Sequence, residues 1–277
     1  MLHHVNLTQN QRFWLTLLSF FLSFVSCFLF ALLTFVRWKQ KEGGMTLYVK
    51  AGPDGKSLGD CPFAHFVRMV LHEKKLEYDL IPSVQETKPA WLIRHYEGKM
   101  PALRHRRECY VESSVIAQYL DFFFPQPVSL TATNKEAQQN AQDKVYGFFP
   151  DAARYLKHSP DGNEQDAERK MHLERHLGLV EEHLGSTEGD YLCGDQFTLE
   201  DCSIAPKLFH LQVGLKAFKN NAIDIPKDYP NLQGYMDRVF ARPSFQETLC
   251  PEETVVWGWT QAREKQALTA PAPRDDD

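Results

Sequence analysis

Residues 46–123 alternate between short runs typical of β-strands and longer runs typical of helices, and this alternation limits the fold. β-branched and aromatic residues predict strands over 46–51, 77–81, 102–104 and 109–111. Apolar periodicity and start signals predict helices over 61–75, 89–96 and 112–123. The order strand, helix, strand, helix, strand, strand, helix predicts a mixed sheet covered by helices.

A cysteine stands at the predicted start of the first helix, in the stretch GDCPFA at 59–64. Pro62 suits the first turn of a helix, where a missing N–H costs nothing. Cys61 then lies at the helix N-terminus, where unpaired N–H groups and the helix dipole favour an anion. We expect its thiol to be partly ionised near neutral pH and nucleophilic, the alternative being a small buried cysteine. Ala64 stands where a dithiol motif has its second cysteine, so an external thiol would resolve any mixed disulfide.

Two features further along the chain are each open to two interpretations. Pro101 either starts a strand or follows a cis bond that would expose the Met100 backbone to an extended ligand. Glu112-Ser113-Ser114 is either a helix cap alone or a cap that, with the helix-start N–H groups, also holds a carboxylate.

The proline-rich stretch FPQPV at 124–128 predicts a boundary between two halves. The first half, 46–124, has the element order of a thioredoxin-like α+β domain. After a linker at 125–133, an all-α domain is predicted over 134–268 and a disordered tail over 269–277. One helix is expected over 134–158, and TLED at 198–201 reads as a capping box that opens another.

The N-terminal segment, 1–45, contains a long apolar run from Phe13 to Val36 that carries no charge. As a helix it would span about 36 Å, enough to cross a hydrocarbon core of about 30 Å. More positive charges follow this run than precede it, which predicts a single membrane anchor with the remaining chain in the cytosol. The alternatives are an organelle-targeting or cleaved segment, and a soluble cytosolic product that starts at Met45.

The overall composition narrows the function classes. The chain has 277 residues and a formal net charge of −5, which gives no electrostatic case for nucleic-acid binding. Its 6 cysteines are scattered, without the paired spacing of a metal site or the density of a disulfide framework. Reduced thiols and no metal are therefore expected.

Several stretches, in order, resemble the glutathione transferase superfamily and within it the plant-type dehydroascorbate reductases. They are LGDCPFAHFVRMVLHEKKLEYDL, KPAWL, EGKMPAL, TLEDCSIAPKLFHLQVGL and VVWGW. The resemblance covers about residues 46–266 and implies the glutathione transferase fold. The chloride intracellular channel family, a sister group, is also similar in its C-terminal half. The family commonly has serine where Ala64 stands, and its loss is expected to raise the pKa of Cys61.

The resemblance implies a role for particular residues. Cys61 corresponds to the catalytic nucleophile. The glutathione contacts would be Lys88, Met100, Pro101, Glu112 and Ser113, and the dehydroascorbate-binding residues would be Lys50, Asp60, His210 and Trp259. Without the resemblance, a histidine such as His210 would more often be a buried core residue, and Trp259 would more often be a residue that only packs in the interior.

The implied function is glutathione-dependent reduction of dehydroascorbate to ascorbate through Cys61, with glutathione as co-substrate. The partners would be these two small molecules and, through 13–36, a membrane; a monomer is favoured over a dimer. Two alternatives stay open: a membrane-associating or scaffold protein of the chloride intracellular channel type, and an omega-type glutathione-dependent thiol transferase. Loss of reductase activity on replacing Cys61, compared between dehydroascorbate and a model disulfide, would distinguish them.

Overall fold

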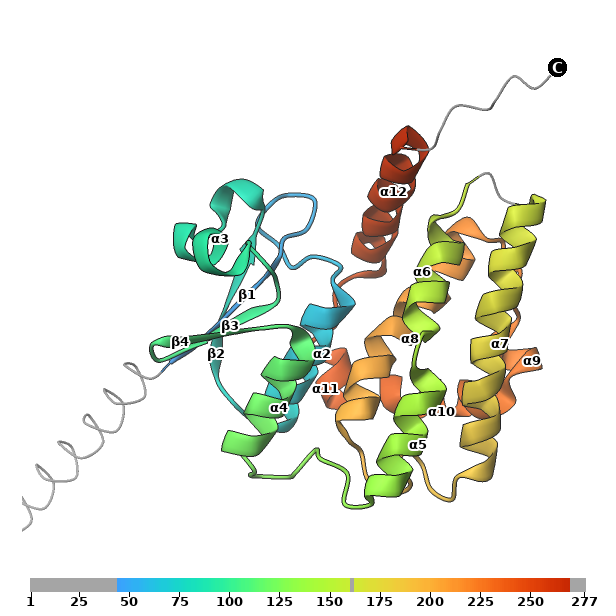
Figure 1. Cartoon of the computed structure of the whole chain (residues 1–277), viewed down its shortest axis with the longest axis horizontal. Coiled ribbons are helices and arrows are strands. Elements are labelled where there is room, and N and C mark those ends of the chain that lie inside the picture. Colours follow the sequence, from blue (N-terminus) through green and yellow to red (C-terminus); the bar gives the residue numbers. More distant parts are fainter. Residues whose placement is uncertain (1–43, 160–161, 270–277) are drawn as a thin grey trace, which may run out of the picture. The chain divides into compact units, whose positions relative to one another are not determined.

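The first half of the protein is built on a four-stranded sheet (Figure 1). The computed structural model describes residues 44–159 and 162–269. The strands are β1 (Met45–Lys50), β2 (Tyr78–Ser83), β3 (Ala102–His105) and β4 (Glu108–Val111), in the spatial order β2-β1-β3-β4. β3 and β4 are antiparallel, with Ala102 opposite Val111. In β1 every second side chain is buried, as expected for a strand with one face on the core.

Helices cover this sheet. They are α2 (Pro62–Glu73), the short 3-10 helix η1 (Gln85–Thr87), α3 (Ala90–Tyr96) and α4 (Ser113–Phe123). α2 packs against α4, whereas α3 lies apart from this pair on the other side of the strands (Figure 1). The predicted order of strands and helices in this half is therefore the observed one, with boundaries shifted by one or two residues.

The second half contains only helices in its described part. They are α5 (Lys135–Val145), α6 (Phe148–Lys157), α7 (Glu164–Ser186), α8 (Leu199–Phe218), α9 (Ile225–Asp228), α10 (Pro230–Phe240), α11 (Pro243–Gln246) and α12 (Glu252–Thr269). α8 packs against α5, α6, α10 and α12 and also against α2 of the first half. It begins with the predicted capping box, in which the Thr198 N–H donates to the Asp201 carboxylate at 2.8 Å.

The single helix expected over 134–158 is in fact two helices. α5 ends at Val145 and α6 begins at Phe148, with Gly147 between them at φ 81°. The extended backbone of Tyr146 ends α5, and Gly147, which without a Cβ adopts a left-handed conformation at no steric cost, precedes the start of α6.

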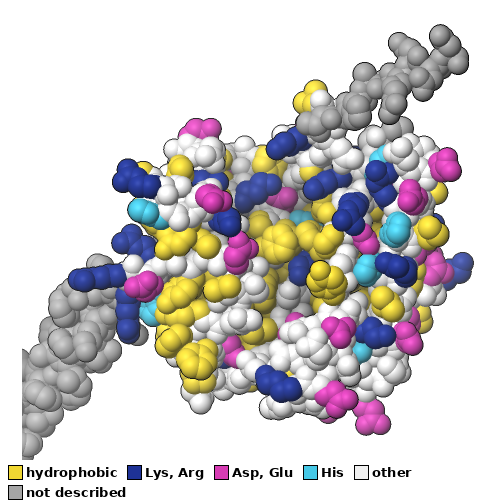
Figure 2. Space-filling view, viewed as in Figure 1, with side chains coloured by type: hydrophobic (Ala, Val, Ile, Leu, Met, Phe, Trp, Pro, Cys, Tyr) yellow, Lys and Arg dark blue, Asp and Glu magenta, His cyan; other side chains and the backbone are white. Residues whose placement is uncertain are grey.

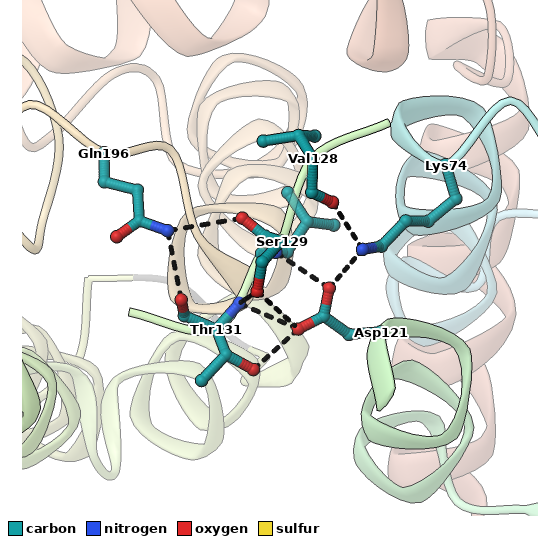
Figure 3. Close-up of polar contacts among 7 residues, drawn as sticks. Lys74, Asp121, Val128, Ser129, Thr131 and Gln196 are labelled. Atoms are coloured by element: carbon teal, nitrogen blue, oxygen red, sulfur yellow. Dashed lines mark hydrogen bonds and ion pairs between the residues drawn. The ribbon is translucent and has the colours of Figure 1, made fainter. Parts of the chain in front are cut away.

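A buried ion pair ties α2 to α4 at the junction of the two halves (Figure 3). The Lys74 ammonium, just after α2, contacts the Asp121 carboxylate of α4, and both side chains are almost completely buried. Lys74 also donates to the Val128 carbonyl oxygen at 2.5 Å. Burying two charges is costly unless their remaining hydrogen-bonding capacity is met, so the surrounding contacts matter.

The segment between α4 and α5 meets that need. Backbone N–H groups of Leu130 and Thr131 donate to Asp121 at 2.8 and 2.9 Å. On the other side, the Gln196 side chain donates to the carbonyl oxygens of Ser129 and Thr131 (Figure 3). The connection between α4 and α5 is thus held to the first half by the Asp121 carboxylate and to the second half by the Gln196 side-chain amide.

Some predictions fall on residues beyond this description. The apolar run 13–36 and tail residues 270–277 lie outside the described residues. Among the helices of 44–159 and 162–269, none is long and apolar enough to cross a membrane. From Thr46 onward the chain forms one compact unit, so the domain boundary at 125–133 stays a prediction.

Candidate active site

Cys61 occupies the position that the sequence predicted, at the N-terminus of α2. It is the residue before the first helical turn, and Pro62 follows it as the first helical residue. Because proline has no N–H, the first free donors of the helix belong to Phe63 and Ala64, and both lower the pKa of Cys61 although its side chain makes no capping hydrogen bond. The thiol is free and its residue is partly exposed.

The predicted ionisation of this thiol needs correction. Burial raises the pKa of Cys61 above its ordinary value of 9.0, and this effect outweighs the donors of Ala64 and Phe63, which lower it. The thiol is therefore protonated at neutral pH in this structure. A helix N-terminus favours a thiolate, but here the protein packed around the sulfur removes more solvation than the helix restores.

A charged pair stands beside the cysteine. Lys50, at the end of β1, and Asp60 are joined by a 2.6 Å ion pair. The Lys50 ammonium also lies 5.1 Å from the centre of the Trp257 ring in α12. Asp60 rests on the same helix at Gly258, where a Cβ would come within 1.8 Å of its carboxylate oxygen. The C-terminal helix thus supports the loop that carries Cys61.

His210 and Trp259 lie together in the interior. Their exposed fractions are 4% and 6%, and their ring centroids are 5.9 Å apart. Burial lowers the pKa of His210 to about 4 against the opposing effect of nearby Asp60, so the ring is neutral at pH 7. Phe149 packs against both rings and against Phe63. The indole N–H of Trp259 is buried and has no hydrogen-bond partner within the described chain.

Most of the predicted glutathione contacts line one cavity of about 500 Å³. Its wall contains Met100, Pro101, Glu112 and Ser113, and the Met100–Pro101 peptide bond is cis. Glu112 precedes α4 with a left-handed φ of 67° and makes no side-chain cap, so the simple capping interpretation is not what the structure shows. The volume is within the range of small-molecule sites.

A second cavity, of about 490 Å³, is lined by two more of the predicted residues. Lys50 and Lys88 line it together with Trp257, and Met100 lines both cavities. Lys50 therefore connects this cavity to Asp60, the residue before Cys61, whereas Cys61, His210 and Trp259 line neither of the two cavities. Within the described residues there is no cluster of His, Cys, Asp or Glu side chains that could hold a metal ion.

Sequence reasoning did not select several residues that line these cavities: Phe63, Lys99, Ser203, Lys207 and Trp257. Lys99 forms an ion pair with Glu112 at 3.4 Å. Trp257 stands in the VVWGW stretch that drew attention to Trp259. Ser203 and Lys207 stand far from Cys61 in sequence, in the TLEDCSIAPKLFHLQVGL stretch, where nothing distinguished them from their neighbours.

Known proteins match the chain in both halves. Residues 60–121 match the family model of the glutathione S-transferase N-terminal domain, and residues 164–238 match that of the C-terminal domain. Glutathione S-transferase DHAR2 of Arabidopsis thaliana is 34% identical over 203 residues, which cover 73% of this chain and 90% of that protein. The chain belongs to the glutathione S-transferase family.

Two more members of the glutathione S-transferase family support this assignment. The probable cytosolic glutathione S-transferase DHAR1 of Oryza sativa subsp. japonica is 34% identical, covering 78% of this chain and 97% of that protein. The crystal structure of Chlamydomonas reinhardtii dehydroascorbate reductase matches with a TM-score of 0.65 and 30% identity. That match covers 79% of this chain and 98% of the other. The predicted glutathione transferase fold is confirmed.

The predicted location was wrong. We expected a membrane-anchored protein with its catalytic domain in the cytosol. Within 44–159 and 162–269 no helix could span a membrane, and the glutathione S-transferases similar to this chain carry the terms cytosolic and chloroplastic in their names. The same findings give no support to the membrane that was predicted as a partner through residues 13–36.

Proposed function

We propose that this glutathione S-transferase family member is a glutathione-dependent reductase that converts dehydroascorbate to ascorbate through Cys61. The observation that supports this most is the free thiol of Cys61 at the N-terminus of α2. Two cavities that share Met100 lie near it: Phe63, two residues after Cys61, lines one, and Lys50, the ion-pair partner of Asp60, lines the other. The choice of dehydroascorbate as the substrate is supported by the similarity to a dehydroascorbate reductase over almost the whole length of that protein.

The cavity that contains Met100, Glu112 and Ser113 suits glutathione. The backbone of Met100 pairs with the glutathione backbone as an added strand. Glu112 accepts from the γ-glutamyl ammonium, while Ser113 and the N-terminus of α4 bind the neighbouring carboxylate. Lys88, in the second cavity, provides a positive charge for the carboxylate at the glycine end.

The dehydroascorbate-binding residues are Lys50, Asp60, His210 and Trp259. Lys50 favours the anionic product, and Asp60 holds Lys50 in place through their 2.6 Å ion pair. The unpartnered indole N–H of Trp259 is a donor for a substrate oxygen. His210 acts as a neutral support for Asp60, because its pKa is lowered to about 4.

The reaction is a thiol cycle whose electrons balance. The Cys61 sulfur adds to a carbonyl carbon of dehydroascorbate and forms a thiohemiketal. The thiolate of a first glutathione attacks that sulfur, the carbon–sulfur bond breaks, and its electron pair leaves with the carbohydrate as ascorbate. Cys61 is then in a mixed disulfide. A second glutathione attacks the glutathione sulfur, which releases oxidised glutathione and restores the Cys61 thiolate.

The substrate is tested by comparing two acceptors. The full chain is assayed with glutathione and either dehydroascorbate or the model disulfide hydroxyethyl disulfide. We expect a kcat/KM for dehydroascorbate that clearly exceeds the value for the disulfide. Equal values, or a preference for the disulfide, would point to a thiol transferase and overturn the named substrate. Glutathione binding with no turnover of either acceptor would overturn the enzyme assignment and favour a scaffold role.

A further inference from the structure

The ammonium of Lys207 is a positive charge in the cavity around Glu112 and Ser113 that the preceding roles do not use. Lys207 lies on α8 and lines the cavity from the helical half, whereas Met100 and Pro101 before β3 and the start of α4 line it from the first half. Its nitrogen is 5.8 Å from the centre of the Phe63 ring, two residues beyond Cys61. Figure 2 shows hydrophobic side chains gathered in the middle of the face where the two halves meet, with basic side chains among them.

The charges in this cavity do not balance. Lys99 is paired with Glu112 at 3.4 Å, so these two charges offset one another. Within the described chain Lys207 makes no ion pair, and its one hydrogen bond goes to the Ser203 hydroxyl at 2.9 Å. A partly buried ammonium with a single neutral partner lacks much of the hydration that it would have in water. Consistent with this, burial lowers the pKa of Lys207 to about 8.

Lys207 does not serve the cysteine directly. The strongest charge effects on the Cys61 thiol come from Asp60, which raises its pKa, and Lys50, which lowers it. The surplus charge of Lys207 is therefore available to a ligand that enters the cavity. That ligand must offer an anionic group near Ser113 and Ser203, and it must tolerate Glu112 close by.

We propose that Lys207 binds the α-carboxylate of the γ-glutamyl group of glutathione, from the side opposite Ser113. This inference rests on the proposed function, which places the γ-glutamyl end at Glu112 and Ser113. That end carries an ammonium and a carboxylate on one carbon, which matches a cavity lined by the Glu112 carboxylate from the first half and the Lys207 ammonium from the helical half. Lys207 thereby makes the helical half a determinant of glutathione specificity.

The test compares the binding of two ligands to two proteins, wild type and Lys207→Met, both with the full chain. The ligands are S-methylglutathione, which cannot react, and its analogue with 4-aminobutyryl in place of γ-glutamyl, which lacks only the α-carboxylate. Binding is measured by calorimetry to wild type and Lys207→Met. We expect Lys207→Met to weaken the binding of S-methylglutathione by about tenfold, which is the effect of losing one charge-assisted hydrogen bond. The affinity for the analogue should be almost unchanged. Lys207→Arg should retain most of the affinity.

A matched control uses another lysine of α8. Lys216 is exposed and contacts Glu252, so Lys216→Met removes a charge from the same helix outside this cavity and should leave both affinities unchanged. If Lys207→Met binds both ligands as wild type does, or weakens both equally, the inference is overturned while glutathione binding stands. If wild type itself does not bind S-methylglutathione, the proposed function fails with it. Should Lys207→Met not fold, Lys207→Gln replaces it.

Discussion

The ammonium nitrogen of Lys50 lies 2.6 Å from a carboxylate oxygen of Asp60, the residue that precedes Cys61. The pair sets two opposing charges beside one thiol: Asp60 raises the pKa of Cys61 and Lys50 lowers it, with Asp60 the stronger of the two. The reactivity of the cysteine therefore depends on a balance that either partner can shift.

Replacing Asp60 by asparagine should make Cys61 more reactive. The substitution keeps the shape that packs against Gly258 and removes the charge that disfavours the thiolate. We expect Cys61 to be alkylated by iodoacetamide several times faster at pH 7 than in wild type. Lys50→Met should have the opposite effect, because it removes the cation. Equal rates in all three proteins would show that the pair does not act on the thiol.

The residue three positions after the cysteine should matter in the same assay. Because burial raises the pKa of Cys61, the alkylation rate of wild type should still be rising above pH 9. Ala64→Ser adds a hydroxyl that can donate to the thiolate at the helix start, so the rate at pH 7 should increase and the pH profile should move to lower pH. A profile unchanged by Ala64→Ser would contradict this explanation.

The buried pair Lys74–Asp121 should contribute strongly to stability. Lys74→Met leaves the Asp121 carboxylate buried without its cation, and we expect the free energy of unfolding in urea to fall by about 3–5 kcal/mol. Lys170→Met is the control, since Lys170 pairs with Glu174 on the half-exposed face of α7 and its loss should cost about 0.5 kcal/mol or less. Similar losses in the two variants would argue against a special role for the buried pair.

The same carboxylate should make stability depend on pH. Burial alone would raise the pKa of Asp121, but hydrogen bonds from Leu130, Lys74 and Thr131 outweigh it, and the net pKa is below 3.8. A folded-state pKa below the unfolded value stabilises the protein above about pH 4 and loses that contribution as the pH falls through the folded value. Urea titrations from pH 6 to pH 3 should therefore show a steeper loss in wild type than in Asp121→Asn.

The indole N–H of Trp259 should act on one substrate only. Trp259→Phe keeps an aromatic ring in the cluster with His210 and Phe149 and removes the unpartnered donor. We expect the KM for dehydroascorbate to rise roughly two- to tenfold, the effect of one hydrogen bond, with the KM for glutathione unchanged. Trp91→Phe, in a separate cluster with Tyr48 and Tyr96, should change neither value. An unchanged KM for dehydroascorbate in Trp259→Phe would assign Trp259 to packing alone.

Local sequence signals predicted the features that depend on a few neighbouring residues. Pro62 marked the start of α2, and TLED marked the start of α8, because capping and proline geometry act within one turn of helix. The break between α5 and α6 was missed because glycine inside a helical pattern is tolerated, and the left-handed φ of Gly147 is not visible in the sequence. The raised pKa of Cys61 and the position of Lys207 come from packing between distant segments, which no local pattern carries.

The most direct measurement is ascorbate formation from dehydroascorbate and glutathione, followed by absorbance, with the full chain as wild type, Cys61→Ser and Cys109→Ser. Cys109 is another partly exposed free thiol, on β4, and so controls for loss of any cysteine. We expect wild type and Cys109→Ser to turn over at similar rates and Cys61→Ser to show no activity above the uncatalysed reaction. Full activity in Cys61→Ser, or none in wild-type protein that binds glutathione, would contradict catalysis by Cys61.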